Sequence, residues 1–114
     1  MTIDDMFESS IRSKGDLAGV FEYDGETGYF YLYATGNSAN QKVVGAIRII
    51  SGVPDFKQTD VTVRWDGTET LVGLFICGRL CAAFDVNSGA QYGGNYHRDT
   101  QSELPLEILT AFQW

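Results

Sequence analysis

Histidine and cysteine, the residues that most often carry catalysis and metal binding, are scarce in this chain. Its 114 residues include one histidine, His97, and two cysteines, Cys77 and Cys81. A C-x3-C pair with one distant histidine provides too few ligands for a structural zinc site. If Gly78–Arg79 forms a two-residue turn, the alternation of strand faces directs the two sulfurs to opposite sides of a sheet. We therefore predict two buried free thiols, and we expect no metal and no cofactor.

The chain also has few positively charged residues and no long apolar run. Eight Lys and Arg stand against fifteen Asp and Glu, a net charge of -7. Nucleic acids and anionic lipids attract basic surfaces, so we expect neither as a partner. No apolar run is long enough for a membrane span, and the acidic start MTIDDMFESS does not resemble a signal peptide. These features predict a cytoplasmic protein, and the acidic balance is compatible with a basic protein partner as well as with plain solubility.

What the sequence does contain is a series of strand patterns separated by turn residues. Hydrophobic residues make up 44% of the chain, enough to fill one core, so residues 1–114 are expected to form a single domain. Strands are predicted at 6–11, 17–23, 29–34, 42–50, 60–66, 70–77 and 80–86. The first of these could instead be a short helix, but a strand places Phe7, Ser9 and Ile11 on one face. The last two are apolar on both faces, so they should lie in the middle of the fold with something packed on each side.

The segments 17–23 and 29–34 predict a β-hairpin around the turn-rich stretch Asp24-Gly-Glu-Thr-Gly28. With a five-residue loop, the expected cross-strand pairs are Tyr23 with Tyr29, Phe21 with Tyr31 and Gly19 with Tyr33. Tyr29, Tyr31 and Tyr33 then form a stripe on one face of their strand. The other face carries Phe30, Leu32 and Ala34, which can supply the core.

The C-terminal segment predicts a short amphipathic helix. Leu104, Ile108, Leu109 and Phe112 recur at helical spacing, Pro105 is acceptable in a first turn, and Ser102 is a candidate cap. The predicted fold is mainly β: a curved antiparallel meander sheet of six or seven strands with one short C-terminal helix packed on it. The alternative is an α+β two-layer arrangement with helices at both ends.

Three stretches of the first third resemble a bacterial family of small uncharacterised domains. They are Phe7-Glu-Ser-Ser-Ile-Arg-Ser13, Val20-Phe21 and Asp24-Gly-Glu-Thr-Gly-Tyr-Phe-Tyr31. Their central string is a hairpin with its turn, which is a folding signature and not an active site. The resemblance implies a small soluble bacterial protein of unknown role, and it brings no catalytic residues.

Candidate binding residues are aromatic and lie in two places. The tyrosine stripe Tyr29, Tyr31 and Tyr33 could bind a flat ligand or a partner's side chains, although such a face is more often covered by the protein itself. The loop 91–99 adds Tyr92, Tyr96 and His97. His97 next to Asp99 could act in acid–base chemistry, but no recognisable nucleophile accompanies it, so no catalytic residue is predicted.

Carboxylates gather around the first hairpin, at Asp16, Glu22, Asp24 and Glu26. They could meet a basic partner, although turn chemistry alone explains Asp24, as it explains Asp66 further along. The leading functional hypothesis is a non-enzymatic protein-binding module, with an acidic inhibitor or immunity-type protein as its concrete version. The alternative is a small-ligand pocket lined by the tyrosines and closed by Gly93–Gly94.

Overall fold

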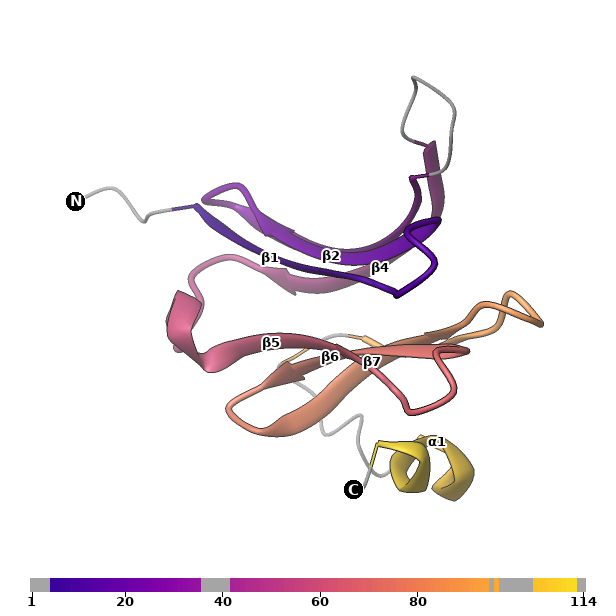
Figure 1. The fold of residues 1–114 in the computed structure, drawn as a ribbon. Helices are drawn as coiled ribbons and strands as arrows, with labels where there is room; N and C mark the ends of the chain where they lie inside the picture. The colour runs from indigo at the N-terminus through magenta and orange to yellow at the C-terminus, as the bar shows by residue number, and fades with distance from the viewer. Residues whose placement is uncertain (1–4, 36–41, 95, 97–103, 113–114) are drawn as a thin grey trace.

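The chain folds into two four-stranded antiparallel sheets stacked as layers, with one short helix beneath the second layer (Figure 1). The computed structural model describes residues 5–35, 42–94, 96 and 104–112. The first sheet holds β1 (Met6–Ile11), β2 (Leu17–Tyr23), β3 (Thr27–Ala34) and β4 (Lys42–Ser51). The second holds β5 (Val61–Trp65), β6 (Leu71–Ile76), β7 (Arg79–Asp85) and β8 (Gln91–Gly93). The mainly β class and the meander order are confirmed, as is the C-terminal helix α1 (Leu106–Ala111).

The strands form two sheets where one curved sheet was expected, and the division falls after β4. There the chain turns at Gly52, whose φ of 100° suits glycine, passes Pro54 and makes a 3-10 turn, η1 (Gln58–Asp60). This connection returns the chain beneath the first sheet, so that β5 lies against β1 (Figure 1). The eighth strand, β8, has only three residues, and its polar, glycine-containing sequence gives no strand pattern.

The two layers bury their facing sides in one hydrophobic core. Phe21 and Phe30 of the first sheet, and Val72 and Leu74 of the second, have no exposed surface. The layers approach most closely at Gly19, where an added Cβ would lie 2.5 Å from a methyl carbon of Val72. A larger residue at this position would force the side chains between the sheets to shift.

Strands β6 and β7 lie in the middle of the second sheet and are covered on both faces, as predicted. One face packs on the first sheet, and the other packs on the C-terminal segment through a second cluster of buried residues, Leu71, Leu80, Ala83, Leu104, Ile108 and Phe112. The helix begins after Pro105, which holds the N-cap position without a side-chain bond. Ser102, the predicted cap, lies outside the described residues. Because residues 6–11 are a strand, the alternative with helices at both ends is also wrong.

The β2–β3 hairpin has a register one residue away from the prediction. Tyr23 pairs with Gly28, and Glu22 pairs with Tyr29. The turn is shorter than expected because the Asp24 carboxylate accepts hydrogen bonds from the backbone N–H groups of Glu26 and Thr27, which ends the loop early. A slip of one residue moves a side chain to the other face, so the tyrosines of β3 share a face with Val20 and Glu22 of β2, and not with Phe21 and Tyr23.

The turn between β6 and β7 is also displaced by one residue. Its central residues are Cys77 and Gly78, with φ of 53° and 80°, which is the backbone of a type I′ turn. Both thiols are free, as predicted, but only Cys81 is buried, and Cys77 is exposed at the turn. Burial raises the pKa of the Cys81 thiol to about 11.

The outer edge of β1 is closed by a side chain from the η1 turn. The amide of Gln58 accepts a hydrogen bond from the backbone N–H of Phe7 at 2.8 Å and donates one to its carbonyl at 2.7 Å. Further along, the indole N–H of Trp65 donates to the carbonyl of Ser10. These bonds occupy backbone groups that an edge strand would otherwise offer to another chain. In the described part of the chain, no helix has the length and apolar character needed to span a membrane.

Candidate functional site: the outer face of the first sheet

The outer face of the first sheet is the side turned away from the second sheet. Because strand faces alternate, the pairing of the strands places on it Phe7, Ser9, Ile11, Ala18, Val20, Glu22, Tyr29, Tyr31, Tyr33, Val43, Ala46 and Arg48. The sheet is curved, and this face is on its concave side (Figure 1). The outer face of the second sheet is covered by α1, whereas none of the described elements packs on that of the first.

A shallow open groove of about 160 Å³ runs along the β1–β2 part of this face. Its lining residues are Phe7, Ser9, Ile11, Ala18, Val20, Glu22, Tyr33 and Thr35. Ala18 and Val20 are 3% and 7% exposed, while Phe7 and Ile11 are 58% and 60% exposed. The groove therefore has a buried apolar floor and two large hydrophobic side chains open to water, an arrangement typical of contact surfaces.

The three tyrosines of β3 form a row beside the groove. The ring centroids of Tyr29 and Tyr31 are 5.6 Å apart with nearly parallel planes, and those of Tyr31 and Tyr33 are 5.7 Å apart in an edge arrangement. Partial burial, and then the negative charge of Glu22, raise the pKa of Tyr31 and of Tyr33 above its ordinary value. The hydroxyls of Tyr31 and Tyr33 are thus protonated near neutral pH and can donate hydrogen bonds, while the row as a whole offers ring faces.

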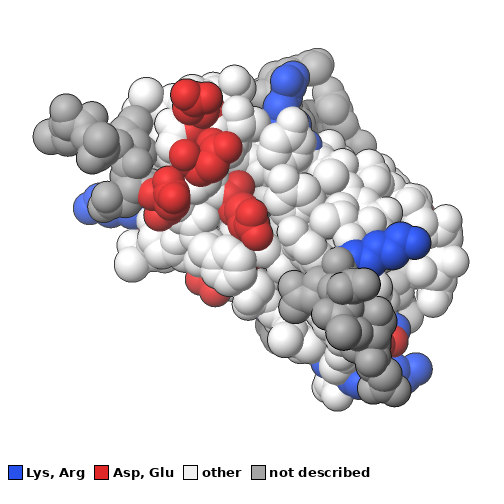
Figure 2. Space-filling view, turned by 90° about the horizontal axis from the view of Figure 1, so that it is seen from above, with Lys and Arg blue, Asp and Glu red and all other residues white. Residues whose placement is uncertain are grey.

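One end of the outer face is acidic. Figure 2 looks onto this face and shows carboxylates gathered at one end, with mostly uncharged surface beside them. The charges of Asp24, Glu26 and Asp5 each contribute, after burial, to the raised pKa of Tyr23. Hydrogen bonds from the backbone N–H of Thr27 and then of Glu26 hold the pKa of Asp24 below its ordinary value. The lowered pKa keeps Asp24 ionised, and the carboxylates gathered at this end favour cations.

The remaining predicted binding residues do not belong to this face. Tyr96 packs its ring on Phe56 at 4.8 Å between centroids, and its backbone N–H donates to the Ile49 carbonyl. Burial, and then a hydrogen bond with Asp55, raise the pKa of Tyr96 to about 12. Tyr92 packs against the cluster of buried residues between α1 and the second sheet. Both have structural roles in these contacts.

The loop residues predicted to close a pocket lie elsewhere. Gly93 and Gly94 are not among the residues that line the groove: Gly93 lies against the backbone of Cys81, and Gly94 lies beside Ile47. Gly93 and Gly94 therefore do not close this groove. His97 and Asp99 are outside the described residues.

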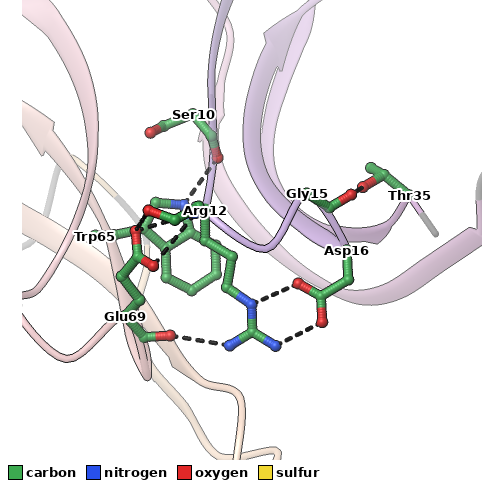
Figure 3. A network of polar contacts seen from close by, with 8 residues as sticks. Ser10, Arg12, Gly15, Asp16, Thr35, Trp65 and Glu69 are labelled. Carbon is green, nitrogen blue, oxygen red and sulfur yellow. Dashed lines mark hydrogen bonds and ion pairs between the residues drawn. The ribbon is translucent and has the colours of Figure 1, made fainter.

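A second polar cluster joins the two layers at one end of the fold (Figure 3). The guanidinium of Arg12 makes two bonds to the carboxylate of Asp16, at 2.7 and 2.8 Å, and a third to the carbonyl of Glu69 at 3.0 Å. The Glu69 carboxylate accepts bonds from the backbone N–H and hydroxyl of Ser13. Because all these groups are mutually satisfied and Arg12 also lies over the Trp65 ring, this cluster stabilises the junction of the sheets.

Sequence reasoning placed the tyrosines on one face but missed the rest of the groove. The β1 pattern did indicate that Phe7, Ser9 and Ile11 share a face. The one-residue error in the hairpin register, however, put the tyrosines opposite Phe21, and so hid their position beside Val20 and Glu22. Arg12 was also missed, because its partner Glu69 is 57 residues away in the sequence.

Comparison with known proteins supports the resemblance seen in the first third of the sequence and extends it over most of the chain. Searches among curated proteins and among solved structures found no similar protein. A bacterial family described as "uncharacterized protein conserved in bacteria" (DUF2251) matches residues 2–104. The matched segment contains both sheets, and with them the whole outer face. The chain belongs to this family of bacterial domains of unknown function.

Proposed function

We propose that this chain is a non-enzymatic, cytoplasmic protein-binding module that contacts a basic partner through the outer face of its first sheet. The observation that carries the proposal is the exposure of Phe7 and Ile11 beside a hollowed, apolar groove. The row of Tyr29, Tyr31 and Tyr33 extends this surface with the aromatic side chains that are enriched at protein interfaces. The acidic end of the face and the net charge of -7 favour a positively charged partner.

Groove size favours a protein over a small molecule as the bound species. Pockets that enclose small ligands usually measure about 300–1,000 Å³ and bury most of the ligand. The groove here measures about 160 Å³ and is open along its length. Tyr33 does line it, so a small aromatic ligand is the second candidate, but a groove of this size and openness would cover only part of such a ligand. A protein surface laid over the whole face would bury the tyrosine row as well.

The proposal is tested by capture from lysate of the source bacterium with variants of the outer face as bait. Phe7→Ser and Tyr31→Ser remove exposed apolar surface, and Leu106→Ser, at a residue 78% exposed on α1, is the matched control. A partner that binds the wild type and the control but neither face variant, and that is released by salt, supports the proposal. A partner retained equally by all four proteins, or none retained at low salt, contradicts it.

The finer form of the proposal is an inhibitor or immunity-type role, in which the basic partner has an activity that this chain blocks. It is supported by the small size of the fold and by the acidic end of its outer face. Once a partner is purified, its activity is measured at saturating amounts of wild type and of Phe7→Ser. Inhibition by the wild type alone is expected, and full activity in both mixtures excludes this role while leaving the binding function standing.

A further inference from the structure

The outer groove and Glu22 together indicate what the partner must present. Resting on the proposed function, we infer that the groove receives one large apolar side chain of the partner, and that Glu22 binds a Lys or Arg carried on the same face of the partner segment. The proposal therefore concerns a two-point contact, an apolar anchor with a cation beside it.

The apolar half follows from the size and lining of the groove. A cavity of roughly 150 Å³ accommodates one benzene ring, so a groove of about 160 Å³ has room for a single aromatic or branched aliphatic side chain. Its floor, at Ala18 and Val20, is already closed to water, and Phe7 and Ile11 stand exposed along its β1 side. An inserted side chain would contact the floor and cover these two residues, removing apolar surface from water on both partners.

The cationic half follows from the position of Glu22. It is an exposed residue that lines the groove, and in the sheet it pairs with Tyr29. Its negative charge contributes, after burial, to the raised pKa of both Tyr31 and Tyr33. An ammonium or guanidinium group bound here would face a carboxylate on one side and tyrosine rings on the other, which combines an ion pair with cation–π attraction.

The strand geometry sets the spacing of the two points. Val20 and Glu22 are two residues apart on β2, which separates them by about 6–7 Å along the strand. A partner matches this distance with residues two apart in an extended segment, or three to four apart on one face of a helix. Adjacent residues in either conformation point in different directions and do not match it.

The test uses short capped peptides on a Gly/Ser background that carry one Phe and one Arg at spacings of one to four residues. Binding to the full chain is followed by amide chemical shifts in NMR. Control peptides replace Phe with Ala, or Arg with Gln, and N-acetylphenylalanine amide is tested alone. We expect the peptides to give saturable shifts at Val20 and Tyr33. The binding affinity should fall about tenfold or more when Phe is replaced, and about threefold at low salt when Arg is replaced.

Two variants of the chain test the same contacts by changing the groove instead of the peptide. Ser9→Phe, at an exposed residue of the groove wall, fills the groove from its rim, and Glu22→Gln removes the charge with little change in shape. Glu107→Gln, at an exposed residue of α1, is the matched control for charge. We expect Ser9→Phe to abolish peptide binding, Glu22→Gln to weaken it to the level of the Arg→Gln peptide, and Glu107→Gln to leave it unchanged.

Three other outcomes would each bear on a different part of the proposal. If no peptide gives saturable shifts on the outer face at concentrations up to about 10 mM, the two-point contact is wrong. If N-acetylphenylalanine amide binds as tightly as the best peptide, the cation has no role, and a small ligand becomes the better candidate. Partner capture that depends on Phe7 and Tyr31 keeps the proposed function even if every peptide fails, so the two failures are distinguishable.

Discussion

Replacement of Gly19 by alanine tests how closely the two sheets pack. A Cβ at this position would lie 2.5 Å from Cγ2 of Val72 and 3.0 Å from Cγ1 of Val63. Both valines are buried in the core between the sheets, so neither can turn outward to make room. Overpacking of this kind typically costs about 1–3 kcal/mol, and because two neighbours are met at once we expect Gly19→Ala to lower the free energy of unfolding by about 2–3 kcal/mol.

The assay is equilibrium unfolding in urea, with Gly67→Ala as the control. A methyl group added at Gly67 would have no other atom within 4 Å, so this change should be neutral or stabilise by up to about 1 kcal/mol through the unfolded state. Val72→Ala removes the nearest contact, so the double variant should lose less stability than the sum of the two single variants, by about 0.5 kcal/mol or more. Equal stability of Gly19→Ala and wild type, with an unchanged slope in urea, refutes this close packing of the sheets.

Three further predictions concern turns, edges and acid stability. Cys77→Asn should raise the free energy of unfolding by about 0.5–1 kcal/mol in urea, because Asn tolerates the positive φ of this type I′ turn better than Cys; a loss of stability contradicts the turn assignment. Gln58→Ala should cost about 1 kcal/mol and speed hydrogen exchange at the Phe7 amide, and unchanged exchange there means that the edge is not closed by this side chain. The hydrogen bond from Arg12 lowers the pKa of Asp16 from 3.8 to about 2, so the stability that this ion pair contributes is present above pH 3.8 and is lost as the pH falls towards 2. Asp16→Asn should therefore flatten the decline of stability in that window, measured by thermal unfolding at a series of pH values. An unaltered decline counts against this ion pair.

Local patterns were enough to predict most strands and their buried faces. Val61, Val63 and Trp65 alternate with polar residues and are buried as expected, because a half-exposed strand imposes a period of two. The doubly apolar segments around Cys81 were correctly placed at the centre of the fold, since such residues have to be covered on both sides. The helix contacts of Ile108 and Phe112 followed from helical spacing in the same way.

Registers and turns were less predictable, because they depend on single hydrogen bonds. The β2–β3 loop ends at Thr27 since Asp24 bonds to the backbone there, and a composition of turn residues over 24–28 does not distinguish this from a longer loop. At the other hairpin, Cys77 adopts a left-handed conformation that its residue type does not suggest. Each error was one residue long, but on a strand one residue exchanges the two faces.

The sequence by itself determined that this protein is a small acidic β domain with free thiols, because composition, alternation and charge are properties of the chain read residue by residue. Only the tertiary structure decided that the strands form two layers, that α1 covers one outer face, and that Phe7, Glu22 and Tyr33 line a single groove on the other. The physical reason is that a binding surface depends on which strands lie side by side and on which face remains uncovered, and both are set by contacts between residues far apart in the sequence.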